Sequence, residues 1–161
     1  MNGAGVRNAV CIRVLIADDQ PRARRSLKAL LTAMRWSTPS RAGQLTPAGF
    51  FPIEVVGEAE NGQQAIEQVR ALHPEVVVMD LQLHAVSTPE PRLDGTAAIQ
   101  MIKSKWPAIR IVVLTMYATD RASVLAAGAD AFLLKGCPTR ELLDAVMPRQ
   151  ADLQASGEKR N

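Results

Sequence analysis

Four short apolar segments, each followed directly by a polar side chain, constrain the fold of this chain more than any other feature. They cover residues 13–17, 76–79, 110–114 and 131–134. Short, continuous runs rich in Val, Ile and Leu are typical of strands that are buried on both faces of a sheet. Stretches with helical spacing of apolar residues separate them. The pattern therefore predicts an α/β fold built on a parallel sheet.

The residues that follow these segments carry charged or hydroxyl groups. Asp18 and Asp19 follow the first segment, Asp80 the second, Thr115 the third and Lys135 the fourth. Parallel strands all point the same way, and open α/β sheets bind ligands at their carboxyl edge. We therefore expect these side chains to converge on that edge.

A convergence of carboxylates at one edge indicates a metal site. Three carboxylates a few ångströms apart repel one another unless a cation joins them. Mg²⁺ fits best, because it uses few protein carboxylates, keeps several waters and accepts phosphate oxygens as its remaining ligands. Lys135 and Thr115 could then bind oxygens of a phosphoryl group. Since a carboxylate can itself accept a phosphoryl group, we interpret Asp80 as the acceptor.

Each of these residues, taken alone, has an ordinary structural explanation. Asp18 and Asp19 could begin a helix, where carboxylates accept hydrogen bonds from the free amides of the first turn. Asp80 could be a turn residue, Thr115 a hydroxyl at a strand end and Lys135 a solvated charge. The hypothesis depends on their joint occurrence, in this order, after strand-like segments.

Four sequence segments resemble the receiver domain of two-component response regulators, in particular the branch that usually carries a LuxR-type DNA-binding domain. They read VLIADDQ at 14–20, VVGEAENG at 55–62, LTMY at 114–117 and AGADAFLLK at 127–135. The resemblance extends over a receiver domain at residues 11–147. We expect a flavodoxin-like, doubly wound five-stranded parallel sheet of order 2-1-3-4-5 with helices on both faces.

The resemblance also implies a role for each site residue. It implies an acidic pair (Asp18 and Asp19), a phosphorylation site (Asp80), a switch hydroxyl (Thr115), a switch aromatic (Phe132) and a phosphate-binding lysine (Lys135). Mg²⁺ would be held by Asp19, Asp80 and the backbone carbonyl of Gln82, with Asp18 acting through a metal-bound water. The implied partner is a sensor histidine kinase or a phosphotransfer protein, and phosphorylation could lead to a homodimer.

Three departures from the family pattern lie near this site. The segment 81–93 is longer than usual and carries His84 where a proline is normal; we interpret His84 as a solvated loop histidine, although it could also orient a phosphoryl group. The segment 115–135 is slightly shorter than usual, which leaves the ordinary mode of dimerisation open. Residues 136–138 read Gly-Cys-Pro, so the cis peptide common there in the family is not assumed.

Composition favours a small protein with one core. The chain has 161 residues, of which 47% are hydrophobic. No apolar run approaches the ~20 residues of a membrane-spanning helix, and no secretory signal is recognisable, so we expect a cytoplasmic protein. Cys11 precedes the first predicted strand and Cys137 follows the last, so they should lie at opposite edges of the sheet, too far apart for a disulfide, and are expected to be reduced.

The charge of the chain gives no support for nucleic-acid binding. Its net charge is +3 and its pI is about 9.2, but the basic residues are scattered. The densest group is Arg22, Arg24, Arg25 and Lys28, which we interpret as a solvated face of the first helix. We therefore expect no direct binding to nucleic acid and none to membranes.

The remaining pattern gives the element boundaries. We expect helices at about 21–34, 61–72, 95–105, 120–126 and 139–147, with Asn61 and Asp94 as N-caps. The second strand should cover residues 53–58. Residues 37–52 should form a loop whose Phe50-Phe51 pair packs against the body, and 1–10 and 148–161 should be flexible termini. No helix-turn-helix follows, so the sequence fits either a stand-alone receiver or the receiver part of a DNA-binding transcription regulator.

Two further functions stay open from the sequence alone. A degenerate receiver would bind partners without being phosphorylated. An aspartate-nucleophile phosphatase would also use acids, a lysine and Mg²⁺, but it needs a second Asp two residues after its nucleophile, and Gln20 and Gln82 occupy those places. We therefore favour a signalling switch over a turnover enzyme.

Overall fold

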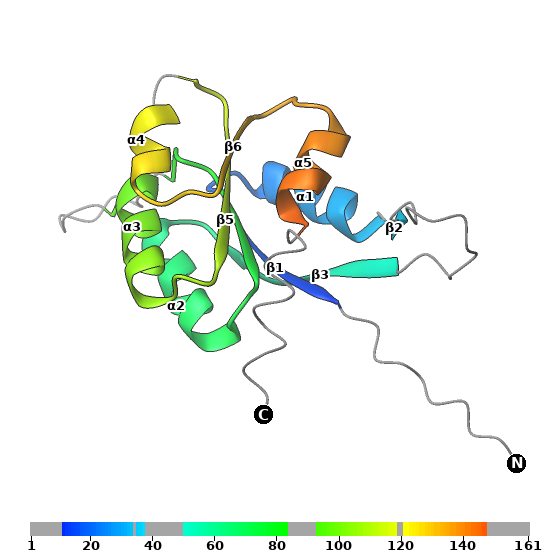
Figure 1. The fold of residues 1–161 in the computed structure, drawn as a ribbon, viewed down its shortest axis with the longest axis horizontal. Coiled ribbons are helices and arrows are strands. Elements are labelled where there is room, and N and C mark those ends of the chain that lie inside the picture. Colours follow the sequence, from blue (N-terminus) through cyan, green and yellow to red (C-terminus); the bar gives the residue numbers. More distant parts are fainter. Residues whose placement is uncertain (1–10, 34, 38–49, 84–92, 119–120, 148–161) are drawn as a thin grey trace, which may run out of the picture.

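The computed structural model describes residues 11–33, 35–37, 50–83, 93–118 and 121–147. Within them a single sheet has helices on both faces (Figure 1). The predictions for 1–10 and 148–161, and those for His84 and most of the segment 81–93, concern residues outside the described part. Among the helices of the described part, none is both long enough and apolar enough to cross a bilayer.

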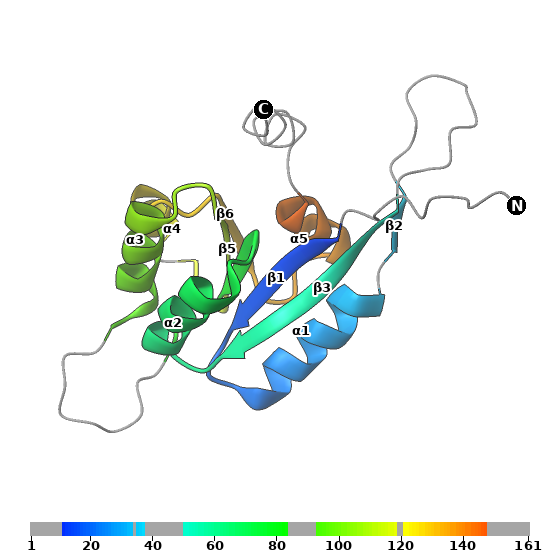
Figure 2. The same ribbon diagram turned by 90° about the horizontal axis from the view of Figure 1, so that it is seen from below.

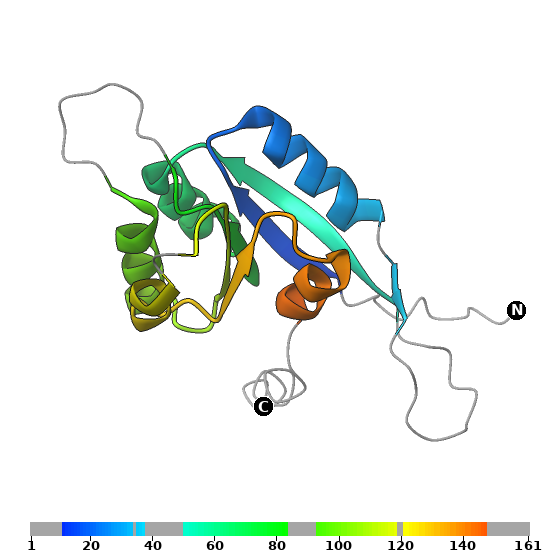
Figure 3. The ribbon, with the colours of Figure 1, turned by 90° about the horizontal axis from the view of Figure 1, so that it is seen from above.

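The sheet confirms the predicted parallel order. Its parallel strands are β1 (Ile12–Ala17), β3 (Phe50–Ala59), β4 (Val76–Met79), β5 (Arg110–Thr115) and β6 (Ala131–Leu134). They lie in the order β3-β1-β4-β5-β6, which is the 2-1-3-4-5 order of a flavodoxin-like sheet. Figures 2 and 3 show the arrowheads of β1 and β3 at the same end of the sheet, where the first helix begins.

An additional antiparallel strand corrects the prediction of a loop over 37–52. Strand β2 (Arg35–Ser37) pairs with Phe50–Pro52, so β3 begins three residues earlier than the predicted strand and a short hairpin arm extends the sheet edge. The sequence did not indicate this pairing because β2 is very short and because Pro52 cannot donate a ladder hydrogen bond. The expected packing of the Phe50 and Phe51 side chains lies outside what the structure describes.

Alternate residues of the central strands enter different cores, which explains their continuous apolar sequences. Leu15 and Ala17 of β1 pack on one face of the sheet and Val14 and Ile16 on the other. The first face is covered by α2 (Gly62–Leu72), α3 (Gly95–Lys105) and α4 (Arg121–Ala126), and the second by α1 (Pro21–Ala33) and α5 (Thr139–Val146). Figure 1 shows these two groups of helices on opposite sides of the strands.

The predicted helix starts are confirmed by their hydrogen bonds. The Asn61 side chain accepts from the Gln64 amide at 2.9 Å, and the Asp94 side chain accepts from the Ala97 amide at 2.7 Å. The reciprocal bond of a capping box is displaced by one residue, because Gln64 Oε1 accepts from the amide of Glu60. The peptide before Pro138 is trans, like the other peptides of the described part.

Gly95 lets α3 approach the backbone that follows β4. A Cβ at this position would lie 2.9 Å from Leu81 Cα and 3.0 Å from Leu81 O. Both atoms belong to the backbone, so a side-chain rotation cannot relieve the contact. The glycine thus allows the backbone at Leu81 to lie directly against the start of α3.

We expect Gly95→Ala to lower the free energy of unfolding by about 1–3 kcal/mol, because an added methyl group overpacks this contact. Urea unfolding measures the effect. The control is Gln100→Ala, an exposed position on the same helix, which should change stability little. An unchanged stability in Gly95→Ala would contradict the close approach.

Candidate functional site

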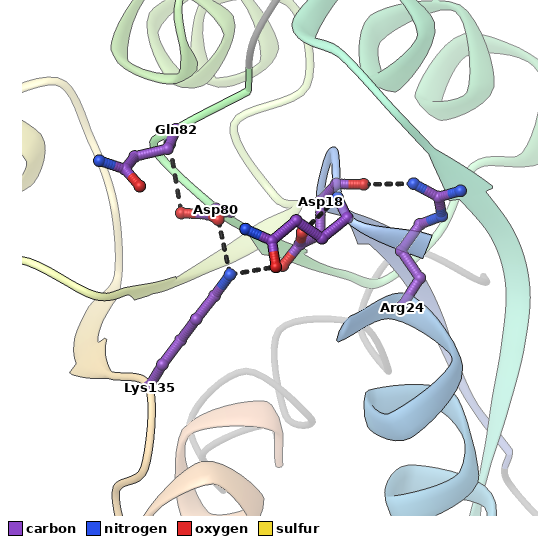
Figure 4. A network of polar contacts seen from close by, with 6 residues as sticks. Asp18, Arg24, Asp80, Gln82 and Lys135 are labelled. Carbon is purple, nitrogen blue, oxygen red and sulfur yellow. Dashed lines mark hydrogen bonds and ion pairs between the residues drawn. The ribbon is translucent and has the colours of Figure 1, made fainter. Parts of the chain in front are cut away.

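The residues singled out in the sequence meet at the carboxyl edge of the sheet. Lys135 Nζ lies 2.7 Å from Asp18 Oδ2 and 2.6 Å from Asp80 Oδ2. Figure 4 shows the lysine reaching between the two carboxylates. One oxygen each of Asp18, Asp19 and Asp80 lies within 4.8 Å of the other two. The predicted convergence of these four residues is therefore observed.

Backbone hydrogen bonds that continue the sheet beyond the strands produce this convergence. The amide of Asp80 donates to Ala17 O at 2.8 Å, and the amide of Asp18 donates to Ala59 O at 3.0 Å. The amide of Lys135 donates to Thr115 O at 2.8 Å. Asp18, Asp80 and Lys135 are thus each the first residue after a parallel strand. The amide of each is still hydrogen-bonded to a neighbouring strand.

The two carboxylates that bind Lys135 are buried. Asp18 is 5% exposed and Asp80 is 4% exposed. Burial of a carboxylate is costly unless a charge or hydrogen-bond donors compensate it. Oδ1 of Asp18 accepts a hydrogen bond from the Gln20 amide at 2.9 Å, and Oδ1 of Asp80 accepts one from the Gln82 amide at 3.2 Å.

The charges of the cluster fit a divalent cation. Oxygen atoms of three carboxylates lie close together beside the ammonium group of Lys135. Oxygen ligands of this type suit a hard cation such as Mg²⁺. The donor set present at this edge is therefore compatible with the ion that the sequence indicated.

The pKa of Lys135 reports the balance of forces at the site. Burial by itself lowers the pKa of this ammonium group, but the hydrogen bonds that it donates to Asp18 and Asp80, together with the negative charges of these carboxylates, outweigh burial, and the net pKa is raised. Lys135 is consequently protonated throughout the neutral range.

The switch candidates lie beside this cluster. Thr115 ends β5 and is 1% exposed. Phe132 on β6 is half-buried, and the Arg121 guanidinium carbon lies 5.9 Å from the centre of its ring, in a cation–π arrangement. A cavity of about 480 Å³ is lined by Phe132, Lys135 and Arg121, among other residues, so the aromatic ring borders open space next to the phosphate-binding candidate.

Arg24 corrects the prediction of a solvated basic face on the first helix. It is only 8% exposed. Its Nη1 donates to the backbone carbonyl of Asp18 at 2.6 Å, and its Nη2 pairs with Glu60 Oε1 at 3.0 Å. The neighbouring Arg22, Arg25 and Lys28 are exposed, as expected. Helical spacing could have placed Arg24 on the inner face of α1, but its charge argued against burial.

Cys11 and Cys137 are free thiols, as predicted. Burial is the largest effect on each, and it raises the pKa of both thiols above the ordinary value. Both therefore stay protonated at neutral pH.

We expect the contribution of Lys135 to stability to disappear only in alkaline solution. A lysine with a raised folded-state pKa contributes its full stability below the unfolded value of about 10.4, and this contribution is lost as the pH rises through the folded pKa. With a chelator present to remove divalent cations, the difference in unfolding free energy between the wild type and Lys135→Met should be constant near neutral pH and shrink above about pH 10.5. Lys105→Met, at an exposed position, is the control; a gap that persists unchanged at high pH would refute this origin.

Comparison with known proteins identifies the family. The model of the response regulator receiver domain matches residues 51–147, which leaves Asp18 and Asp19 outside the matched part. The response regulator protein VraR of Staphylococcus aureus strain Mu3 is 31% identical over 137 residues, which cover 84% of this chain and 54% of that protein. The chain thus spans about half the length of the curated relatives it matches.

Similar solved structures agree with this match. The response regulator domain of Thermotoga maritima CheB has a TM-score of 0.63 at 27% identity, covering 89% of this chain and 97% of that one. A LuxR-family two-component response regulator from Aurantimonas sp. SI85-9A1 has a TM-score of 0.61 at 27% identity, covering 83% and 81%. The isolated REC domain of Salmonella enterica serovar Typhimurium RcsB, with phosphomimetic BeF3-, has a TM-score of 0.63 at 26% identity, covering 89% and 88%. With the acidic cluster and the flavodoxin-like sheet, these matches show that the chain belongs to the receiver-domain family of two-component response regulators.

Proposed function

We propose that this chain is a phosphoacceptor switch in which Asp80 receives a phosphoryl group from a phosphohistidine of a partner kinase or phosphotransfer protein. The observation that carries the proposal is the buried bridge from Lys135 to Asp18 and Asp80. It supports the proposal because it brings the carboxylates of Asp18 and Asp80 and one ammonium group around one small volume.

The transfer is a displacement at phosphorus. A carboxylate oxygen of Asp80 forms the new bond to phosphorus while the phosphorus–nitrogen bond of the phosphohistidine breaks, and the departing imidazole nitrogen takes up a proton from solvent. Lys135 already donates to Asp80. It needs only a small movement of its flexible side chain to bind an oxygen of the incoming group and stabilise its charge.

The acidic cluster would supply ligands for Mg²⁺. We assign Asp19, Asp80 and the backbone carbonyl of Gln82 as direct ligands, and Asp18 as a partner through a metal-bound water. A bound Mg²⁺ would neutralise charge on the transferred group and help to hold it in line. The amide of Gln82 donates to Asp80 Oδ1, which orients the acceptor side chain.

The output is a change of population between two surface states. Thr115 binds the aspartyl phosphate through its hydroxyl group, and Phe132 turns inward as Thr115 moves. Inverting a 1:99 ratio of states requires about 5.5 kcal/mol of differential stabilisation. Gln82 and Tyr117 are both exposed. They flank the path by which water reaches the aspartyl phosphate, and they tune its lifetime.

We infer that the signal acts on transcription through a longer regulator. Full-length VraR is about twice as long as the matched region. A structure of RcsB bound to the promoter rprA covers 84% of this chain at 27% identity. In this role the longer regulator contacts DNA, and the residues described here undergo the phosphorylation.

Incubation with a small-molecule phosphodonor and Mg²⁺, followed by intact mass measurement, tests the acceptor role. The chain should gain one phosphoryl group, and Asp80→Asn, which has a nearly identical shape but no nucleophilic carboxylate, should gain none. Demonstrable Mg²⁺ binding without any mass gain would favour a degenerate receiver. Continuous release of inorganic phosphate without a phosphorylated protein would favour a phosphatase.

Thr115→Val separates phosphorylation from the switch, because it keeps the buried shape and removes the hydroxyl group. We expect phosphorylation of Asp80 to persist while the chemical-shift changes of Phe132 and its neighbours on phosphorylation are lost, as measured by NMR. Thr115→Ser retains the hydroxyl group and should retain those changes. A full response in Thr115→Val would remove Thr115 from the switch.

A further inference from the structure

We propose that Arg24 is a positioning residue for the metal site, fixing the peptide that joins Asp18 to Asp19. This inference rests on the proposed function, because it assumes that the acidic pair binds Mg²⁺. It assigns a role in the site to a residue of α1 that is itself no ligand.

Arg24 binds two acceptors at once, the Asp18 carbonyl and the Glu60 carboxylate, and we call this pair of contacts the clamp. Its guanidinium group bonds Asp18 O at 2.6 Å through Nη1 and Glu60 Oε1 at 3.0 Å through Nη2. The side chain of Arg24 is 10% exposed, against 55% for that of Glu60. A guanidinium so deeply buried needs strong acceptors, and its rigid fork can bind two of them at once. Figure 4 shows the group directed at the Asp18 carbonyl from the first helix.

The carbonyl that Arg24 binds lies within the peptide unit that connects the acidic pair. A peptide unit is planar, so fixing the Asp18 oxygen also fixes the direction in which the chain continues to Asp19. The amide of Asp18 itself donates to Ala59 O at 3.0 Å. The Asp18 side chain accepts a hydrogen bond at Oδ1 from the Gln20 amide at 2.9 Å. Arg24 thus completes a set of bonds that determines how the two carboxylates are oriented relative to each other.

Two opposing effects on cation binding can be separated. The positive charge of Arg24 would repel Mg²⁺, so its removal would tighten binding if electrostatics dominated. Glu60 offsets that charge through its ion pair with Arg24. Loss of the clamp would instead loosen the ligand geometry that Mg²⁺ requires, because this ion tolerates little departure from octahedral coordination. We expect the geometric effect to be larger.

A third explanation is purely structural. Arg24 lies in the first turn of α1, where its amide donates to Gln20 O at 3.1 Å. If the side chain only anchored this helix to the residues that follow β1 and β3, its replacement would lower stability and leave the Mg²⁺ affinity of the folded protein unchanged. Affinity and stability therefore need to be measured on the same variants.

The experiment is a calorimetric titration of Mg²⁺ alone into the full chain. In Arg24→Met we expect about tenfold weaker binding, in the range typical for loss of a group that orients a metal ligand. Arg25→Met removes the same charge from an exposed position of the same helix and should bind within about twofold of the wild type. Arg24→Lys, which keeps the charge but has no fork, should fall between them.

A kinetic measurement provides a second readout. With a small-molecule phosphodonor, the Mg²⁺ concentration for half-maximal phosphorylation should rise about tenfold in Arg24→Met, while the rate at saturating Mg²⁺ stays close to that of the wild type. A merely structural role would not separate these two quantities in this way.

The outcomes are distinct. Unchanged or tighter Mg²⁺ binding in Arg24→Met, with wild-type binding intact, would overturn the positioning role and leave the phosphoacceptor proposal standing. Absence of Mg²⁺ binding in the wild type would overturn both. If Arg24→Met does not fold, Arg24→Lys decides, because binding equal to that of Arg25→Met would overturn the clamp.

Discussion

The ion pairs from Lys135 to Asp18 and Asp80 are the interaction on which the rest of the site depends. Both carboxylates are almost completely buried, and two buried like charges a few ångströms apart are tolerated only with a cation between them. The lysine contributes this charge from the loop after β6, whereas the carboxylates come from the loops after β1 and β4. One ammonium group therefore ties together three strand ends that are distant in the sequence.

In the function proposed above, the same cluster serves both stability and signalling. Three carboxylates and one ammonium group lie together there, and a divalent cation and a phosphoryl group would change which of them are paired. Lys135 would then exchange a carboxylate for a phosphate oxygen without leaving the site. Arg24 contributes differently, because it binds the backbone carbonyl of Asp18 rather than its carboxylate. It therefore constrains the orientation of the peptide between Asp18 and Asp19 more than it changes the charge of the cluster.

Much of the fold was predictable because the strands are buried on both faces and their sequences are continuously apolar. Asn61 and Asp94 marked helix starts through side-chain chemistry that is local in the sequence. The strand β2 was missed, since a short edge strand has no burial pattern to report it. Arg24 was missed for another reason: an arginine is usually solvated, and its burial depends on finding the Asp18 carbonyl and Glu60, which is 36 positions away.

The sequence by itself determined which groups would reach the carboxyl edge, because every parallel strand delivers the residue that follows it to the same side of the sheet. Asp18, Asp19, Asp80, Thr115 and Lys135 could therefore be named from their places after apolar segments. Only the tertiary structure decided how these groups pair. Strand order and register set the distance from Lys135 Nζ to each carboxylate, and helix packing set which arginine of α1 turns inward. Contacts of that kind depend on angles and separations between elements, which no local pattern of residues encodes.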